Sequence, residues 1–318
     1  MNRLVGIVIL NWNGYEDSCN CLRSLMELNY HAVKVWVVDN ASSNNEADRL
    51  KVEFPWANIV PLKENIGFCG GCNEGMKKAM QAGAEYIMLL NNDALVTPSL
   101  LDELITGYSS LKNPGAVSPL IMHYPETEKI WFSEAKWMTN WSTGEAGFSL
   151  NNGKEYDALS KLPPYKSEFA CGCCLFVSAA VVKQIGLFDE RYFAFFDEAE
   201  WCARMNKKGF QSYSIPTAKM FHKVGGTVPS LVMTYLITRN KLLWIRENLS
   251  WFRKLNTWPA VAKDIFWHWR NIRGKIPAHK QYVSPKVSEV CLRGFRDYKK
   301  KKFGKWDKSL EKLLFPKS

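Results

Sequence analysis

The sequence predicts an α/β domain with a mostly parallel central sheet, followed by a basic helical region. In the first hundred residues, short apolar runs rich in β-branched residues alternate with stretches of helical periodicity, and the connections are short. This alternation is typical of βαβ units, whose strands run parallel. From Ser230 onward the apolar spacing is helical. We therefore divide the 318 residues into a domain at 1–228 and a helical region at 229–318.

Four buried strands are predicted, at residues 4–10, 33–38, 58–62 and 86–90. Helices are predicted between them, at 18–28, at 45–54, and from a glycine-rich loop at 65–75 to about residue 83. An amphipathic run begins at Ser99, and the composition of residues 123–168 predicts an extended β-rich or loop insertion. In the helical region, the spacing predicts Arg239, Asn240 and Arg246 on polar faces.

The charge of the chain is distributed unevenly. The net charge is +11, but residues 226–318 alone carry 21 Lys and Arg against 6 Asp and Glu, and they hold 6 of the 13 Trp. Basic residues interleaved with Trp suit an anionic membrane surface or nucleic acid. Residues 259–272 and the run Lys299–Lys302 are the candidate membrane contacts. The simpler interpretation is a helical subdomain with a solvated face.

Cysteine usage and hydropathy indicate an intracellular protein. Nine cysteines in a chain of this length do not make a disulfide scaffold, and no second Cys or His pair follows at zinc-finger spacing. We expect reduced, buried thiols. No apolar run reaches the roughly 18–20 residues of a spanning helix, and residues 4–10 are too short for a secretory signal. The expected location is the cytoplasm.

A polar cluster follows the most apolar strand. Asn91, Asn92 and Asp93 come directly after five apolar residues. Ligands of open α/β sheets bind at the carboxyl ends of strands. A carboxylate flanked by amides at that place suits a divalent cation that holds a diphosphate. On this segment alone, Asp93 could equally cap the next helix.

The glycine-rich segment is neither a dinucleotide fingerprint nor a P-loop. It lacks the G-x-G-x-x-G spacing directly after a strand, and no Gly-Lys-Ser/Thr follows. It could bring backbone N–H groups and a helix N-terminus towards phosphates. Alternatively, its glycines only allow a tight turn and close helix packing.

Four motifs occur in order within about a hundred residues. They are Asn11-Trp12-Asn13, Val38-Asp39-Asn40-Ala41-Ser42-Ser43, the segment containing Asn65, Gly67, Phe68, Gly70, Gly71, Asn73 and Gly75, and Leu90-Asn91-Asn92-Asp93. Together they resemble family-2 glycosyltransferases, and more narrowly the rhamnosyltransferase-like branch that builds surface polysaccharides. The resemblance covers about residues 4–122 and 170–305, and Cys72 departs from it where the family often has Asn. It implies a GT-A fold, an inverting reaction and a divalent cation, Mg²⁺ or Mn²⁺.

Two later motifs also match. The stretch from Asp197 to Arg204 resembles the family's acidic catalytic motif and places Glu198 at the general base, with Asp197 as the alternative. Carboxylates packed together raise one another's pKa, which suits a base. Without the resemblance, a solvated acidic helix start is the simpler interpretation. His222 lies in a stretch that resembles the family's terminal motif, as a ligand of the cation or diphosphate or as a structural residue.

The resemblance implies a direct displacement with a dTDP- or UDP-linked sugar as donor and a glycan or lipid-linked acceptor. Glu198, or Asp197, would deprotonate the acceptor, and Asp93 with His222 would hold the cation. The implied nucleotide-sugar-binding residues are Asn11, Trp12, Asn13, Asp39, Asn40, Asn65, Gly67, Gly71, Asn73 and Asn91. Three tryptophans of the insertion, Trp131, Trp137 and Trp141, are candidates for stacking on acceptor sugars. The basic tail would hold the enzyme peripherally on the inner face of the cell membrane.

Two other classes of protein are considered. A sugar nucleotidyltransferase shares a nucleotide-binding α/β core, but it should carry a glycine-rich basic loop after the first strand, where this chain has Asn11-Trp12-Asn13-Gly14. A nucleic-acid-binding protein would explain the basic tail but not the motif series. We therefore expect no nucleic acid partner.

Overall fold

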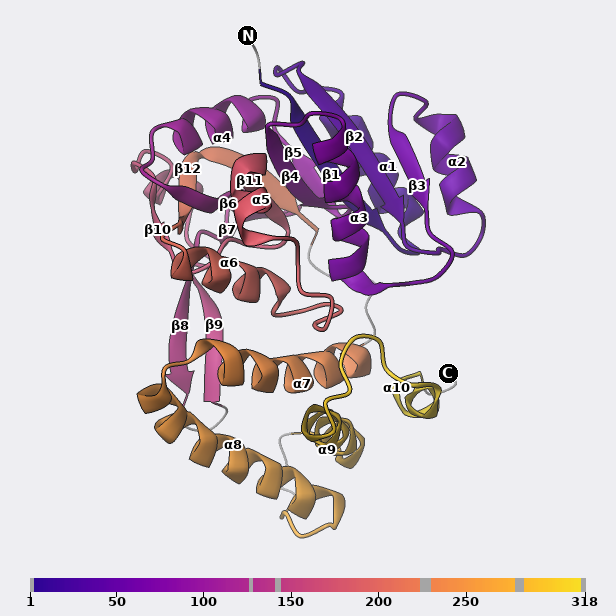
Figure 1. The fold of residues 1–318 in the computed structure, drawn as a ribbon, viewed down its shortest axis with the longest axis vertical. Coiled ribbons are helices and arrows are strands. Elements are labelled where there is room, and N and C mark those ends of the chain that lie inside the picture. The colour runs from indigo at the N-terminus through magenta and orange to yellow at the C-terminus, as the bar shows by residue number, and fades with distance from the viewer. Residues whose placement is uncertain (1–2, 126–127, 141–143, 224–229, 278–282, 316–318) are drawn as a thin grey trace. The chain divides into compact units, whose positions relative to one another are not determined.

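A computed structural model of the chain describes residues 3–125, 128–140, 144–223, 230–277 and 283–315. The chain divides into two compact units (Figure 1). The sheet unit comprises Met1–Lys136, Phe148–Asp189 and Trp201–Thr227. The helical unit comprises Trp137–Gly147, Glu190–Glu200 and Val228–Ser318. Two short segments from the first two thirds of the sequence therefore belong with the C-terminal helices.

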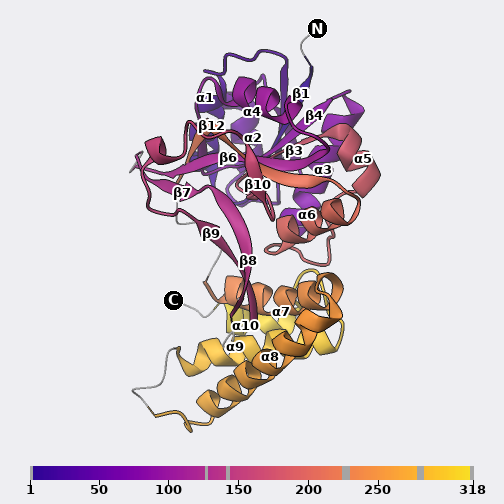
Figure 2. The ribbon, with the colours of Figure 1, turned by 90° about the vertical axis from the view of Figure 1, so that its left-hand side faces the viewer.

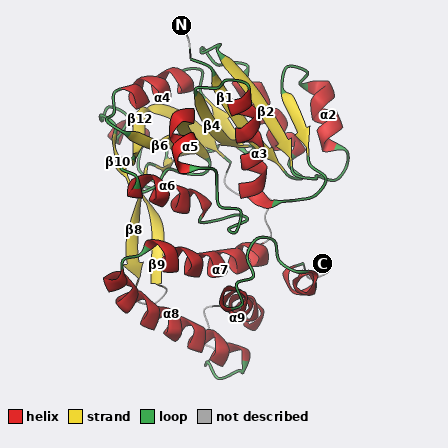
Figure 3. Ribbon diagram, viewed as in Figure 1, coloured by secondary structure: helices red, strands yellow, loops and turns green. Residues whose placement is uncertain are grey.

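One large mixed sheet dominates the sheet unit (Figure 3). Its strand order is β10-β12-β6-β11-β4-β1-β2-β3, with β5 paired to β12 and β7 to β6. Strands β12, β6, β4, β1, β2 and β3 run in one direction, whereas β11 and β10 run in the other. The strands are β1 Val5–Asn11, β2 Val33–Asp39, β3 Asn58–Pro61, β4 Tyr86–Asn91, β5 Ala94–Val96, β6 Pro114–His123, β7 Ile130–Phe132, β10 Tyr165–Ser167, β11 Cys174–Ser178 and β12 Gln211–His222. The mostly parallel α/β architecture predicted from the sequence is confirmed.

Helices cover both faces of the parallel part of the sheet. They are α1 Tyr15–Leu25, α2 Glu46–Glu53, α3 Gly67–Gln81, α4 Leu100–Ser109 and α5 Ala179–Ile185. A 3₁₀ turn lies at Tyr156–Ala158, and helix α6 Asp197–Lys207 begins in the helical unit. Side chains alternate between the faces of a strand. On β1, Ile7 and Ile9 point into the main hydrophobic core together with residues of α1, α2 and α4. The intervening Val8 and Leu10 point towards α3 on the other face.

The predicted glycine-rich loop is wrong, because most of it is helix. Helix α3 begins at Gly67, so Gly70, Gly71 and Gly75 lie in its first turns. A Cβ at Gly71 would lie 2.2 Å from Leu10 Cδ1, and one at Gly75 would lie 2.2 Å from Val8 Cγ1. Glycine costs up to about 1 kcal/mol in a helix interior relative to Ala. Close packing of α3 on β1 outweighs this cost, as the close-packing interpretation of these glycines predicts.

The helical unit is built from long helices (Figure 2). They are α7 Ser230–Asn248, α8 Trp251–Ile272, α9 Pro285–Lys299 and α10 Glu311–Leu314, with a 3₁₀ turn at Lys308–Leu310. Helix α9 packs against both α7 and α8. The strands β8 Glu134–Asn140 and β9 Gly144–Leu150 form a separate two-stranded sheet. The prediction of helices after Ser230 is confirmed, and no helix in the described ranges is long and apolar enough to cross a bilayer.

Two expectations about buried groups have different outcomes. All nine cysteines are buried and none is in a disulfide, as expected. Arg239 and Asn240, which the periodicity predicts on polar faces of the helix, are fully buried. Helical periodicity marks the apolar face of α7, but it does not reveal that the segment at residues 190–200 covers part of the polar one.

Candidate active site

The carboxyl ends of β1 and β2 are joined by a buried polar network. Asn11 and Asp39 are register partners at the ends of these parallel strands. Asn11 is fully buried, and its Nδ2 donates to Asp39 Oδ1 (2.8 Å) and Glu46 Oε2 (2.9 Å). Its Oδ1 accepts from Ser18 Oγ (2.7 Å). The Asn11 amide is therefore engaged within the protein, and it orients the Asp39 carboxylate.

Hydrogen bonds join the turn that follows β1 to the turn that follows β2. Asn13 has a positive φ of 52°, which Asn tolerates better than most residues. Its exposed Oδ1 accepts from both the backbone N and the Oγ of Ser43, each at 2.8 Å. Trp12, between Asn11 and Asn13, is half-buried. The predicted nucleotide-sugar-binding turn is thus one half of a hydrogen-bonded double turn, with Asn13 on its surface.

A second network connects β2 to the start of α3. Asn40 is buried, and its Nδ2 donates to Asn65 Oδ1 and to the Gly67 carbonyl oxygen, both at 3.1 Å. Its Oδ1 accepts from the Ile66 backbone N–H (3.0 Å). Asn65 Oδ1 also accepts from the Gly67 N–H (2.9 Å). The two asparagines therefore fix the first turn of α3 at the carboxyl edge of the sheet.

Asn73 lies deeper in α3 and holds a different segment. Its Nδ2 donates to the Phe188 carbonyl (3.0 Å), and its Oδ1 accepts from the Phe188 N–H (2.9 Å). This two-point contact ties α3 to the chain that follows α5. Gly71 is equally internal, against Leu10.

Asp93 and His222, which are 129 positions apart in the sequence, lie side by side. Strand β5 pairs antiparallel with β12, so that His222 opposes Ala94, and the Lys223 N–H donates to the Asp93 carbonyl (3.0 Å). Asp93 Oδ1 lies 3.2 Å from His222 Nε2. The Trp131 ring lies against His222, with 4.5 Å between the ring centroids. The predicted metal pair is brought together by strand pairing.

The donor atoms at this pair fit a divalent cation. Among the described residues, neither Asp93 Oδ1 nor His222 Nδ1 has a hydrogen-bond partner, although both atoms are buried. The 3.2 Å contact therefore lacks hydrogen-bond geometry, and a buried carboxylate oxygen without a partner calls for an explanation such as an ion. No group of three or more Cys, His, Asp or Glu suited to a metal occurs in the described ranges. A cation such as Mg²⁺ that keeps one or two protein ligands takes the rest from substrate phosphates and water.

The neighbours of Asp93 exclude the capping interpretation. Helix α4 has Ser99 as its N-cap, and strand β5 lies between Asp93 and that helix. Asn91 ends β4 and its N–H donates to the Cys173 carbonyl (2.9 Å). Asn92 belongs to the polar cluster predicted after this strand, but it is not among the implied nucleotide-sugar-binding residues. Its Nδ2 donates to Ser18 Oγ (3.1 Å) and the Gly14 carbonyl (3.3 Å), which links β4 to the first turn.

The two candidate bases lie in the helical unit, at the start of α6. Asp197 is buried and Glu198 is half-buried, so the solvated interpretation of this helix start is wrong. Burial, followed by the negative charge of Glu198, raises the pKa of Asp197 well above its usual range. Burial also raises the pKa of Glu198. A carboxylate that is costly to keep ionised has the driving force to accept a proton.

The raised pKa of Asp197 predicts a pH-dependent stability. Because its pKa is raised in the folded state, its contribution to the free energy of unfolding is full below the unfolded-chain value of about 3.9 and is lost as pH rises through the folded-state pKa. Asp197→Asn removes this titration. We therefore expect the melting temperature of the variant, relative to the original chain, to rise between about pH 4 and pH 8. A pH-independent difference in thermal melts would contradict this expectation, and Glu289→Gln, on an exposed site of α9, is the control.

Of the three tryptophans predicted as candidates for stacking on acceptor sugars, the structure describes the side chain of one. Trp131 contacts His222, as described above. The side chain of Trp137 and the whole of Trp141 lie outside the described residues. The sheet unit gathers one cluster around Asn11, Asp39, Asn40 and Asn65 and a second at Asp93 and His222.

Comparison with known proteins identifies the chain. The family model described as "Glycosyl transferase family 2" matches residues 6–186, more than half of the chain. The dTDP-rhamnosyl transferase RfbF of Shigella flexneri is 24% identical over 260 residues, covering 78% of this chain and 82% of that protein. The N-acetylglucosaminyl-diphospho-decaprenol L-rhamnosyltransferase of Mycobacterium tuberculosis is 23% identical over 258 residues, covering 74% of this chain and 82% of that protein.

A solved structure supports the same fold. GalNAc-T7 with UDP, GalNAc and Mn²⁺ superposes with a TM-score of 0.58 at 15% identity, covering 99% of this chain and 58% of that one. At this identity the likeness shows the fold alone, a GT-A fold. Together with the ordered motifs on the sheet edge, these findings show that the chain belongs to glycosyltransferase family 2 and is a glycosyltransferase of the rhamnosyltransferase-like kind.

Proposed function

We propose that this glycosyltransferase moves a hexosyl or deoxyhexosyl group, with inversion, from a dTDP- or UDP-linked sugar to a glycan or lipid-linked acceptor. The observation that carries the proposal is the Asp93–His222 pair, in which the buried Asp93 Oδ1 lies 3.2 Å from His222 Nε2 and has no hydrogen-bond partner among the described residues. The names of the relatives support the chemistry of the two substrates, since one uses dTDP-rhamnose and the other a diphospho-decaprenol acceptor.

In the proposed mechanism, each cluster has one task. Asn11 holds Asp39 in place to bind the base and ribose, and Asn13 ties the turns after β1 and β2 together. Asp93 and His222 would hold Mg²⁺ or Mn²⁺, which when bound neutralises the charge of the diphosphate leaving group. Glu198 accepts the proton of the acceptor hydroxyl as that oxygen attacks the anomeric carbon and the nucleoside diphosphate leaves. One displacement at that carbon inverts its configuration.

A donor panel tests the proposal directly. Thermal-shift and sugar-release measurements with dTDP-, UDP- and GDP-sugars, each with and without Mn²⁺, are expected to select a dTDP- or UDP-sugar with metal present. Transfer to a diphospho-lipid acceptor then tests the second substrate. A sugar nucleotidyltransferase would instead make nucleotide-sugar and pyrophosphate from a nucleoside triphosphate and a sugar 1-phosphate. Detection of that reaction without glycosyl transfer would overturn the assignment.

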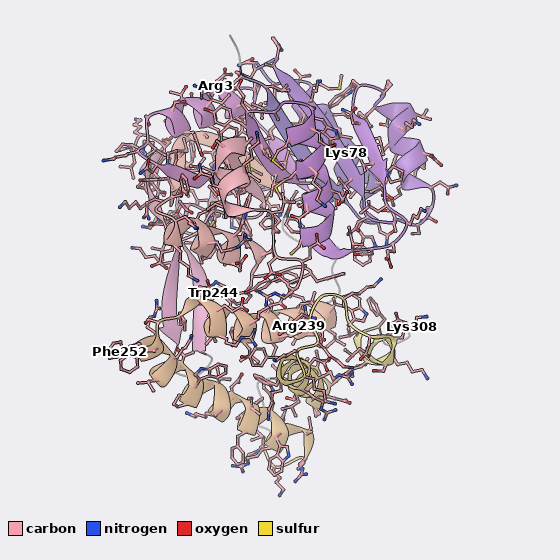
Figure 4. All side chains as sticks on the ribbon, viewed as in Figure 1. Arg3, Lys78, Arg239, Trp244, Phe252 and Lys308 are labelled. Carbon is pink, nitrogen blue, oxygen red and sulfur yellow. The ribbon has the colours of Figure 1, made fainter. Side chains whose placement is uncertain are left out.

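The proposal includes attachment to an anionic membrane surface through the helical unit. Helix α8 exposes Trp251, Phe252, Leu255 and Phe266, with 62, 63, 63 and 56% of each residue accessible, and Figure 4 shows Phe252 near the start of α8. The same helix exposes three basic residues, Arg253, Lys263 and Arg270. Arg273, which directly follows its last residue, is also exposed. Exposed apolar side chains flanked by basic ones are typical of helices that lie in a membrane interface.

Binding to anionic liposomes is the expected result of this surface. Co-sedimentation should fall at high salt, because exposed charges are screened, but should not vanish, because burial of aromatic rings is insensitive to salt. Replacing Lys299, Lys300 and Lys301 by Ser should weaken binding without changing donor affinity. Lys302 is kept because it pairs with Asp307 (3.1 Å). Replacing Trp251 and Phe252 by Ser should remove the salt-resistant part. If the intact protein ignores anionic liposomes at low salt, the membrane part of the proposal fails.

A further inference from the structure

The segment before the candidate bases has an unusual backbone. Phe193, Phe195 and Phe196 all have positive φ, at 67°, 67° and 66°. Bulky side chains rarely adopt this region, because the Cβ atom then lies too close to the backbone carbonyl oxygen. Three of them within four positions persist only if surrounding groups hold them. We name residues 191–196 the left-handed turn.

Two buried side chains of α7 hold this turn by its carbonyl groups. Asn240 Nδ2 lies 2.8 Å from the carbonyl oxygens of Tyr192 and Ala194 and 3.0 Å from that of Phe195, so its two N–H groups are shared among three acceptors. Arg239 Nη2 donates to the carbonyls of Tyr192 (3.2 Å) and Arg191 (3.3 Å). Contacts of one amide group with three carbonyl groups of residues 192–195 define the path of the turn.

Arg239 in turn fixes Asn240. Its Nε and Nη2 lie 3.1 and 3.0 Å from Asn240 Oδ1, so the amide is held with its NH₂ group towards the turn. Its Nη1 donates to the Gly304 carbonyl (2.6 Å), and Gly304 N donates to the Arg191 carbonyl (2.8 Å). Both side chains are fully buried, and Figure 4 shows Arg239 on α7. A planar guanidinium with five donors suits such convergent acceptors better than an ammonium group does.

The left-handed turn leads directly into the candidate bases. Phe196 precedes Asp197, and its carbonyl accepts the first hydrogen bond of α6, from the Glu200 N–H (2.9 Å). Phe193 is anchored in the core of the helical unit with Tyr235 and Leu236 of α7. Arg191, at the other end of the turn, pairs with Glu247 through two contacts of 3.0 and 2.9 Å. The direction in which α6 begins is therefore set by α7.

We propose that Arg239 and Asn240 are positioning residues that fix the Asp197–Glu198 carboxylates by holding the left-handed turn. This inference rests on the proposed role of Glu198 as general base. The positive φ values of the turn are unfavourable for residues other than glycine. Hydrogen bonds from Arg239 and Asn240 of α7 stabilise this backbone conformation. Misplacement of a reacting group by about 1 Å can lower a rate by about 10²-fold. Loss of the hydrogen bonds from Arg239 and Asn240 should therefore lower kcat.

The first test is Asn240→Asp. Asp has the same shape as Asn, but its carboxylate has no N–H group to donate. Its oxygen would face the three carbonyl oxygens that Asn240 Nδ2 contacts. With the donor and acceptor found by the panel above, kcat should fall about 10- to 100-fold, while donor affinity stays within about twofold. Leu242→Ala, at a buried position of the same helix, controls for general loss of packing. It should lower the melting temperature without this separation of kcat from donor affinity.

The second test changes the backbone conformation, both in the otherwise unchanged chain and in combination with Asn240→Asp. Phe195→Ala and Phe195→Gly remove the same ring, but only Gly adopts a positive φ at no steric cost. If the left-handed turn positions the bases, Phe195→Gly should turn over faster than Phe195→Ala. The expected ratio is about fivefold to thirtyfold when the variants are combined with Asn240→Asp, and smaller in the otherwise unchanged chain, where Asn240 still holds the turn.

The outcomes separate this inference from the proposed function. If the unchanged chain shows no metal-dependent donor binding or transfer, the proposed function fails first. If it does, and Asn240→Asp keeps kcat within about threefold, or the Ala and Gly variants turn over equally in both backgrounds, the positioning role is overturned. A parallel loss of kcat, donor affinity and melting temperature, as in Leu242→Ala, would also overturn it.

Discussion

Glu198→Gln is expected to lower glycosyl transfer by about 10²–10⁴-fold, the usual contribution of a positioned general base. The amide keeps the size and shape of the carboxylate but cannot take a proton. Burial raises the pKa of Glu198, so the carboxylate gains more from protonation than an exposed one would. Donor affinity should be unchanged, because the proposed donor-binding residues lie in the sheet unit. Single-turnover transfer together with calorimetric donor binding measures both quantities.

The neighbouring Asp197 supplies the discriminating variant. Asp197→Asn should lower transfer less than Glu198→Gln does, and Glu289→Gln should have no effect. If Asp197→Asn shows the large loss and Glu198→Gln does not, Asp197 is the base. The two carboxyl groups interact, so a pH–rate profile would report apparent pKa values of the pair rather than of either residue.

Asp93→Asn is expected to abolish the strengthening of UDP or dTDP binding by Mn²⁺ or Mg²⁺. The variant removes the negative charge of the buried oxygen that lies 3.2 Å from His222 Nε2. A neutral amide oxygen is a much weaker ligand for a hard divalent cation, and without the cation the charge of the leaving diphosphate is not compensated. Transfer should therefore fall in parallel with metal-dependent affinity.

Calorimetry with and without metal measures this effect. Asp102→Asn, on an exposed site of α4, is the matched control and should bind nucleotide as the unchanged chain does. His222→Ala should weaken metal-dependent binding in the same direction. If Asp93→Asn and the unchanged chain bind nucleotide with equal metal-dependent affinity, Asp93 is not a metal ligand. The family assignment does not depend on this result.

Local pattern in the sequence determined the α/β order, because strands buried on both faces appear as continuous apolar runs. It also determined the polar residues that end those strands, and with them the resemblance to family-2 glycosyltransferases. Asn11, Asp39 and Asn40 are found at one edge of the sheet because parallel strands end together. The order of helices and strands and the polar residues at the strand ends depend only on nearby residues and on the regular geometry of a sheet. The periodicity of apolar residues in the sequence therefore predicts them.

Contacts between distant segments were decided only by the tertiary structure. The pairing of β5 with β12 brings His222 to Asp93, and no local pattern encodes that register. The helical start of α3 at Gly67 follows from close packing on Leu10 and Val8, which outweighs the low helix propensity of glycine. Arg239 and Asn240 are polar in sequence yet fully buried, because a turn 45 or more residues earlier presents its carbonyl groups to them. Hydrogen-bond partners of a buried polar side chain are a property of the folded chain, since only folding brings such acceptors within about 3 Å.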